Sequence, residues 1–104
     1  MLNLRIKHTK IESTPELEVY VEEKMSKIEK YLGDIQVIHF DIELEKTTEH
    51  HHKGDIYRAE VNLELPGELL RIERTEDDIM KAIDKVEDHL IEAIKKYKDK
   101  KSGN

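Results

Sequence analysis

One stretch indicates the fold most clearly. It is Ile38-His39-Phe40-Asp41-Ile42-Glu43-Leu44-Glu45-Lys46, in which apolar and polar residues alternate. A period of two is typical of a β-strand with one face on a core and the other in water. The same alternation recurs on both sides of this stretch, and the last strand follows the turn residues Pro66-Gly67. The predicted strands span residues 2–7, 35–46, 57–65 and about 68–74. In the second of them, the side chains expected to face the core are Ile38, Phe40, Ile42 and Leu44.

Two other stretches have the apolar spacing of helices. Thr14 is a favourable N-cap, Pro15 suits the first helical position, and Gly33 suits the C-terminal cap. Thr75 is predicted to cap a second helix, whose first turn would be Glu76-Asp77-Asp78. The first apolar stripe is Leu17, Val21, Met25, Ile28 and Leu32; the second is Ile79, Ala82, Ile83, Val86, Leu90, Ala93, Ile94 and Tyr97.

The predicted order of elements is therefore β-α-β-β-β-α. Each strand has one apolar face and each helix one apolar stripe, so two helices on one face of a four-stranded sheet would bury both. We expect a single α+β domain over residues 1–98. Residues 47–55 are expected to form a hairpin loop, and residues 99–104 a polar tail that suits the start of a linker.

Composition limits the class of protein. The chain has 104 residues, no cysteine, 24 acidic and 18 basic residues, and a net charge of −6. Disulfides and thiolate chemistry are excluded, and no apolar run approaches the roughly 20 residues that cross a bilayer. The N-terminus lacks the apolar stretch of a signal peptide, so a cytoplasmic protein is expected. The charge is segregated: residues 34–78 contain 13 acids and 5 bases, whereas residues 93–101 contain 5 bases and 1 acid.

Few residues suggest catalysis or metal binding. No nucleophile or glycine-rich phosphate motif is present, and Asp41, Glu43 and Glu45 are interpreted as a solvated sheet face, so no enzyme and no cofactor are predicted. The tripeptide His50-His51-His52 is a weak candidate for a metal site, with Glu49 and Asp55 as additional ligands.

The flanks of the two helical stripes carry a stronger signal. On the first helix one flank contains Tyr20, Lys24, Lys27, Lys30 and Tyr31. On the second helix one flank contains Lys81, Lys85, His89 and Lys96, interrupted by Glu92. Lysines at this spacing can neutralise successive phosphates, and tyrosine can stack on an unpaired base. If the two basic flanks meet across a shared groove, they would form a polyanion-binding surface; otherwise they are ordinary solvated helix faces.

Several segments together resemble a known family. They are Ile11-Glu12-Ser13-Thr14-Pro15-Glu16-Leu17, Tyr20-Val21, Lys24 to Leu32, Glu43 to Lys46, Leu65-Pro66-Gly67, Asp78, Ala82-Ile83-Asp84 and Lys95-Lys96-Tyr97-Lys98. Their order over residues 2–98 is similar to that in bacterial ribosome hibernation-promoting factors, also called ribosome-associated translation inhibitors.

This resemblance implies a fold like that of double-stranded-RNA-binding domains. It also implies a partner, the small ribosomal subunit with its 16S-type rRNA, and a function: the protein would occupy the mRNA and tRNA channel near the decoding centre and block initiation. DNA, membranes and small-molecule substrates are not implied. By position, rRNA contact falls on Lys24, Lys27 and Lys30 of the first helix and on Lys95, Lys96 and Lys98 of the second.

The second helix departs from the family pattern. It lacks the usual tyrosine in Ile79-Met80-Lys81-Ala82-Ile83-Asp84, and His89 and Glu92 stand where the family has lysine and arginine. Lys81 and Lys85 are possible partial replacements. An alternative function is a protein-interaction module that uses an acidic outer sheet face, formed by Asp41, Glu43, Glu45, Glu60 and Glu64.

Overall fold

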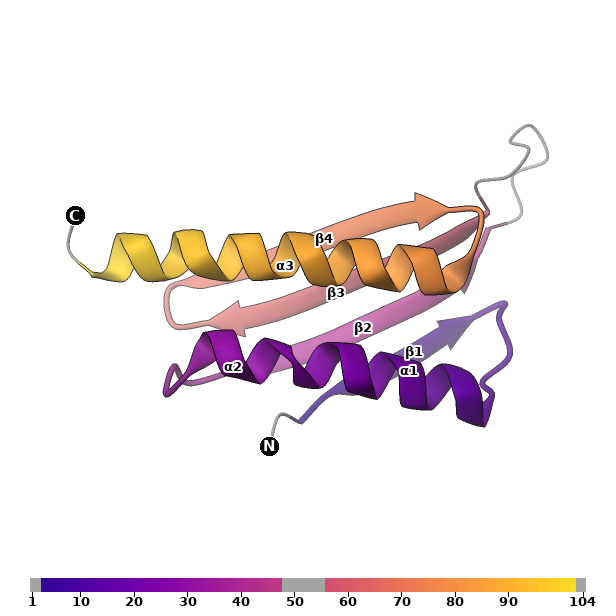
Figure 1. Cartoon of the computed structure of the whole chain (residues 1–104), viewed down its shortest axis with the longest axis horizontal. Helices are drawn as coiled ribbons and strands as arrows, with labels where there is room; N and C mark the ends of the chain where they lie inside the picture. The colour runs from indigo at the N-terminus through magenta and orange to yellow at the C-terminus, as the bar shows by residue number, and fades with distance from the viewer. Residues whose placement is uncertain (1–2, 48–55, 103–104) are drawn as a thin grey trace.

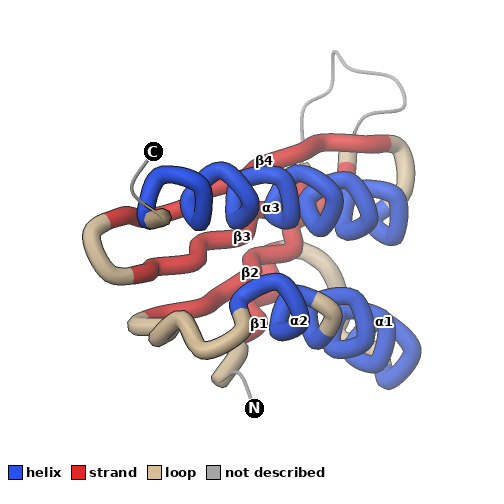
Figure 2. Tube along the Cα trace, turned by 60° about the vertical axis from the view of Figure 1, so that its left-hand side comes forward, coloured by secondary structure: helices blue, strands red, loops and turns tan. Residues whose placement is uncertain are grey.

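The computed structural model describes residues 3–47 and 56–102. It contains a mixed four-stranded sheet in the order β1-β2-β3-β4, with the helices packed on one face (Figures 1 and 2). The strands are β1 (Arg5–Thr9), β2 (His39–Lys46), β3 (Tyr57–Leu65) and β4 (Glu68–Glu76). The helices are α1 (Pro15–Ser26), α2 (Ile28–Leu32) and α3 (Ile79–Lys101). The predicted fold class and element order are confirmed.

The sheet register explains how the core forms. β1 pairs parallel with β2 through the crossover formed by α1 and α2, whereas β2, β3 and β4 pair antiparallel. The register aligns Ile42 with Val61 and Val61 with Ile72, so apolar side chains share the sheet face beneath the helices. Phe40, Val61 and Leu90 are at most 2% exposed. Burial of these strand faces and helix stripes holds the two layers together.

The first helix differs from the prediction of one continuous helix. α1 ends at Ser26 and α2 begins at Ile28, with Lys27 between them. The Lys30 N–H donates to the Lys27 carbonyl at 3.3 Å, which is the tighter i+3 spacing. The predicted caps are present: Thr14 Oγ1 accepts from the Leu17 N–H at 3.2 Å, and Gly33 has a positive φ of 60°.

The predicted start of the second helix is wrong. Thr75 does not cap it, because β4 continues to Glu76 and Thr75 pairs with Arg58 of β3. Asp78 is the N-cap instead, and its Oδ1 accepts from the Met80 N–H at 3.1 Å. Thr75 is part of the extended β4 strand that pairs with β3, so the helix begins only after the strand ends.

The ends of three other helices or strands differ from the prediction. β1 begins at Arg5 instead of residue 2, and α3 extends to Lys101, within the expected tail. β2 begins at His39, and Ile38, which was expected in the core, is 54% exposed. Ile38 lies just before the strand, where its N–H donates to the Glu64 carbonyl at 2.9 Å.

Candidate nucleic-acid interface

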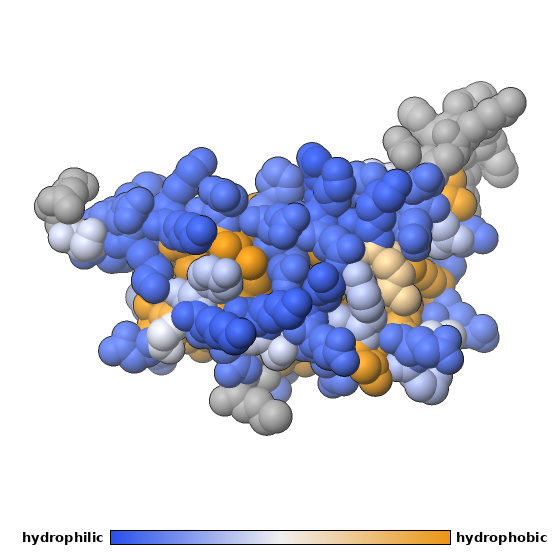
Figure 3. All heavy atoms as spheres, in the orientation of Figure 1, coloured by the Kyte–Doolittle hydropathy of each residue, from blue (hydrophilic) through white to orange (hydrophobic). Residues whose placement is uncertain are grey.

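The helix layer forms one broad face, which is mostly hydrophilic with apolar atoms visible between the helices (Figure 3). α1 and α2 lie along one side of α3. The first-helix flank predicted to be basic does face α3, because Tyr20, Lys24 and Tyr31 all contact it. The charges that it meets change along the length of α3.

Near the start of α3, the basic side chain of α1 meets acidic side chains. The Lys24 ammonium is 3.2 Å from Asp84 Oδ1 and 3.9 Å from Glu87 Oε1. The Tyr20 hydroxyl donates to Asp84, and the Lys24 ammonium also lies 5.5 Å from the Tyr20 ring centroid. The hydrogen bond with Asp84 raises the pKa of Lys24, and burial together with the same carboxylate raises the pKa of Tyr20. Lys24 is therefore a charged link between α1 and α3.

Glu87 is a buried acid that the sequence prediction missed. Glu87 is 6% exposed. Burial raises the pKa of its carboxyl, and the Lys24 ammonium opposes that change. A signal was present, because Glu87 lies four residues after Ile83 and three before Leu90, which are both in the apolar stripe.

Near the end of α3 the contact is basic. The Lys95 ammonium lies 5.8 Å from the centroid of the Tyr31 ring, and the Lys98 ammonium donates to the Tyr31 carbonyl at 2.8 Å. Lys27 lies one helical turn before Tyr31, and Lys30 immediately precedes it. We name Lys27, Lys30, Tyr31, Lys95 and Lys98 the lysine cluster. Within residues 3–47 and 56–102, none of its four ammonium groups forms an ion pair with a carboxylate.

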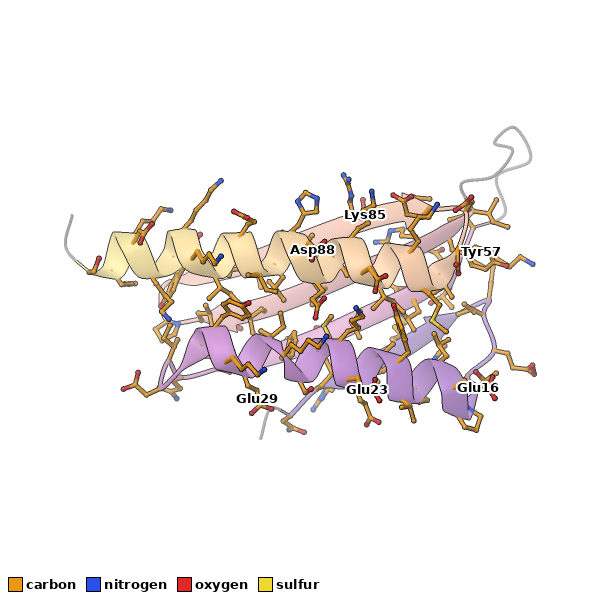
Figure 4. The ribbon with its side chains drawn as sticks, viewed as in Figure 1. Glu16, Glu23, Glu29, Tyr57, Lys85 and Asp88 are labelled. Carbon is orange, nitrogen blue, oxygen red and sulfur yellow. The ribbon has the colours of Figure 1, made fainter. Side chains whose placement is uncertain are left out.

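A shallow hollow borders the lysine cluster. It is lined by Tyr31, Asp88, His89, Ile91 and Glu92. Asp88 is labelled on α3 in Figure 4. The cluster is therefore a basic patch with acids on one side, and a bound polyanion would lie toward α2 and the end of α3, away from those carboxylates.

The other predicted basic flank lies elsewhere. Asp84 and Glu87 occupy the flank of α3 that faces α1, so the helical spacing places Lys85, His89 and Lys96 on the opposite flank. Figure 4 shows Lys85 on the edge of α3 that is turned away from α1 and α2. The expectation that the two basic flanks meet across a shared groove is therefore wrong. Lys81 does not join the two flanks either, because its ammonium pairs with Asp77, at 3.0 Å.

The outer face of the sheet carries the predicted acids, but arginines lie among them. Arg58 is the centre of this network: its Nε is 2.7 Å from Glu73, and its Nη1 is 2.9 Å from Glu45. Its two Nη atoms also pair with Glu43, at 3.6 Å, and with Glu60.

Further contacts occupy most of the remaining acids. Arg71 Nε is 3.0 Å from Glu60, the amide of Asn62 donates to Asp41 at 3.1 Å, and His39 also pairs with Asp41. Glu60 is 9% exposed, although it was predicted to lie on the wet face, because these side chains cover it. The acidic face is largely paired within itself.

The candidate metal ligands His50, His51 and His52 lie outside the described residues. Among residues 3–47 and 56–102, no group of three or more histidine, aspartate or glutamate side chains is arranged to hold a metal ion. In that same part of the chain, no helix combines the length and apolarity needed to span a membrane.

Comparisons with known proteins agree with this architecture. The crystal structure of the Protein Y N-terminal domain of Thermus thermophilus is 28% identical, with a TM-score of 0.76, and the match covers 92% of this chain and 99% of that one. A ribosomal subunit interface protein of Coxiella burnetii, 20% identical, has the same fold, with a TM-score of 0.71 over 92% of this chain and 97% of that one. No match was found among curated proteins. The family model described as sigma 54 modulation protein / S30EA ribosomal protein matches residues 4–102, so the chain belongs to that ribosome-associated family.

Proposed function

We propose that the protein is a ribosome-associated translation inhibitor that acts by occlusion and not by catalysis. It would bind the small ribosomal subunit, in the mRNA and tRNA channel near the decoding centre, through contacts between its helix layer and rRNA. Family membership over residues 4–102 supports an association with ribosomes. Because ribosomes lie in the cytoplasm, the proposal places the protein there.

The observation that carries the proposal is the lysine cluster. Lys95 and Lys98 contact Tyr31, Lys27 and Lys30 are its neighbours on the same helical segment, and none of these four lysines forms an ion pair with a carboxylate of the described residues. Phosphates bound at such a patch release counterions, which favours binding at low salt even though the whole chain is anionic. The Tyr31 ring offers a surface for an unpaired base.

The other predicted RNA-binding residues have different expected roles. Lys24 and Lys81 already pair with acids, so they would contribute less than the cluster. Lys85, His89 and Lys96 form a second basic strip on the far flank of α3. On a partner as large as a ribosomal subunit, this strip would meet a different segment of rRNA.

A matched pair of variants tests the proposal. The first replaces Lys27, Lys30 and Lys95 by glutamine, and the second replaces Lys7, Lys10 and Lys46, which lie outside the helix layer. Both change the net charge equally. We expect the first variant to bind the small subunit much more weakly and the second to retain its binding. With about 0.7 counterions released per single-strand phosphate contact, the salt dependence of log K should flatten by about 2 in the first variant only.

The measurement is co-sedimentation with separated small and large subunits at two salt concentrations. Equal weakening of both variants would show that net charge, and not the lysine cluster, governs binding. Preferential binding to the large subunit would contradict the proposed location.

The alternative role, a protein-interaction module on the outer sheet face, has less support. Four of its five acids pair with Arg58, Asn62 or His39, which leaves Glu64 as the exposed member without an ion pair in the described part of the chain. A face neutralised in this way attracts a basic partner weakly.

A further inference from the structure

A buried carboxylate lies beside the lysine cluster and has no part in the function proposed above. The Glu87 side chain is 7% exposed and lies on the flank of α3 that faces α1. Its Oε1 is 3.9 Å from the Lys24 ammonium, whereas its Oε2 has no hydrogen-bond partner among the described residues. An ionised carboxylate with an unsatisfied buried oxygen is costly, and protonation removes that cost.

The charged surroundings of Glu87 come from both helices. On the side of α1 they are Tyr20, Lys24 and Lys27, and on α3 they are Asp84 and Asp88. The side chains that the sheet places beneath the helices are apolar, including Phe40, Ile42 and Val61. Burial is the main effect that raises the pKa of Glu87. The ammonium groups of Lys24 and Lys27 lower it, and the two aspartates raise it further.

A polyanion at the lysine cluster would change this balance. Lys27 belongs to the cluster and also acts on Glu87 electrostatically, while Lys24 contacts Glu87 directly. A phosphate drawn to either ammonium would compete with the carboxylate for the positive charge and would repel it. Both effects penalise ionised Glu87 and spare its protonated form.

We propose that RNA bound at the lysine cluster is held more tightly when Glu87 carries a proton, so that affinity rises as the pH falls. Binding and proton uptake are then reciprocally coupled: RNA promotes protonation of Glu87, and protonation promotes RNA binding. The inference rests on the proposed function, because it requires a polyanion on this face. It makes Glu87 a positioning residue, which acts on RNA through Lys24 and Lys27.

The test measures the binding of a single-stranded RNA oligonucleotide to the whole chain by fluorescence anisotropy, at about pH 6 and about pH 8. Three proteins are compared: the original chain, Glu87→Gln and His89→Gln. The His89 variant is the control for the exposed imidazole on the far flank of α3, which lines the same hollow as Tyr31. We expect the original chain to bind the RNA about three- to tenfold more tightly at the lower pH. If RNA binding raises the pKa of Glu87 by one unit, the affinity can change by at most about tenfold.

Glu87→Gln is expected to bind well at both pH values and to lose most of that ratio, whereas His89→Gln should keep most of it. A Glu87→Gln protein with the original pH ratio would overturn the inference and leave the proposed function intact. If the original chain binds no RNA at either pH, the proposed function itself fails.

A second measurement covers the case in which Glu87→Gln does not fold, as judged by circular dichroism. Calorimetric titration of His89→Gln with the same RNA, in two buffers of different ionisation enthalpy, reports proton uptake directly. Uptake on binding near neutral pH supports the inference, and zero uptake refutes it.

Discussion

Replacing Arg58 by methionine tests how the outer sheet face is held together. The Arg58 guanidinium contacts four carboxylates, those of Glu43, Glu45, Glu60 and Glu73, and its own side chain is only 19% exposed. Methionine keeps the aliphatic stem that covers the sheet but removes every donor. The four carboxylates would then lie close together on three adjacent strands with no central cation.

The expected loss follows from how exposed each contact is. The Glu60 side chain is 11% exposed, so its charged hydrogen bond should contribute about 1.5–3 kcal/mol. The other three side chains are 27% to 54% exposed, and each of their pairs should contribute only a few tenths of a kcal/mol. We therefore expect the free energy of unfolding to fall by about 2–4 kcal/mol, and the melting temperature by about 10 °C or more.

The assay is urea denaturation near neutral pH, followed by circular dichroism. Arg71→Met is the matched control, because Arg71 also contacts Glu60, at 3.0 Å, but is 67% exposed; it should cost less than about 1 kcal/mol. Adding Glu60→Gln to Arg58→Met should restore part of the stability, since one repelling charge is removed. About 1 M salt should also reduce the loss through screening. If Arg58→Met costs no more than Arg71→Met, the central role of Arg58 is refuted.

Two further predictions concern α3. Asp78→Ala should lower the free energy of unfolding by about 1 kcal/mol while Thr75→Ala changes it by a few tenths at most, because only Asp78 caps the helix; thermal denaturation showing the reverse order would contradict the assignment. Burial raises the pKa of Glu87, so the folded chain binds a proton that the unfolded chain has released, and stability should fall as the pH rises through the folded pKa. Glu87→Leu should remove this decline and be about 1–3 kcal/mol more stable near pH 7.5; urea-unfolding profiles that run parallel between about pH 5 and pH 8 would refute it.

Much of the fold follows from local signals in the sequence. Strand alternation in residues 39–46, the Thr14 cap and the turn at Pro66-Gly67 each indicate their element through nearest neighbours alone, and the structure contains all three. These signals are local because a cap, a turn or an alternating strand is satisfied within a few residues. The resemblance to the ribosome-associated family, carried by the order of short segments, is likewise confirmed.

Tertiary structure decided the rest. Thr75 and Asp78 are both good caps in the sequence, and only the length of the β3–β4 ladder selects Asp78. The sequence determines which residues of α3 share a flank, but the side on which α1 lies depends on how the crossover between β1 and β2 places that helix on the sheet. That placement turns Lys85 away from α1 and buries Glu87 against Lys24. The charges were all readable in the sequence, whereas which of them meet was fixed by packing between elements far apart in the chain.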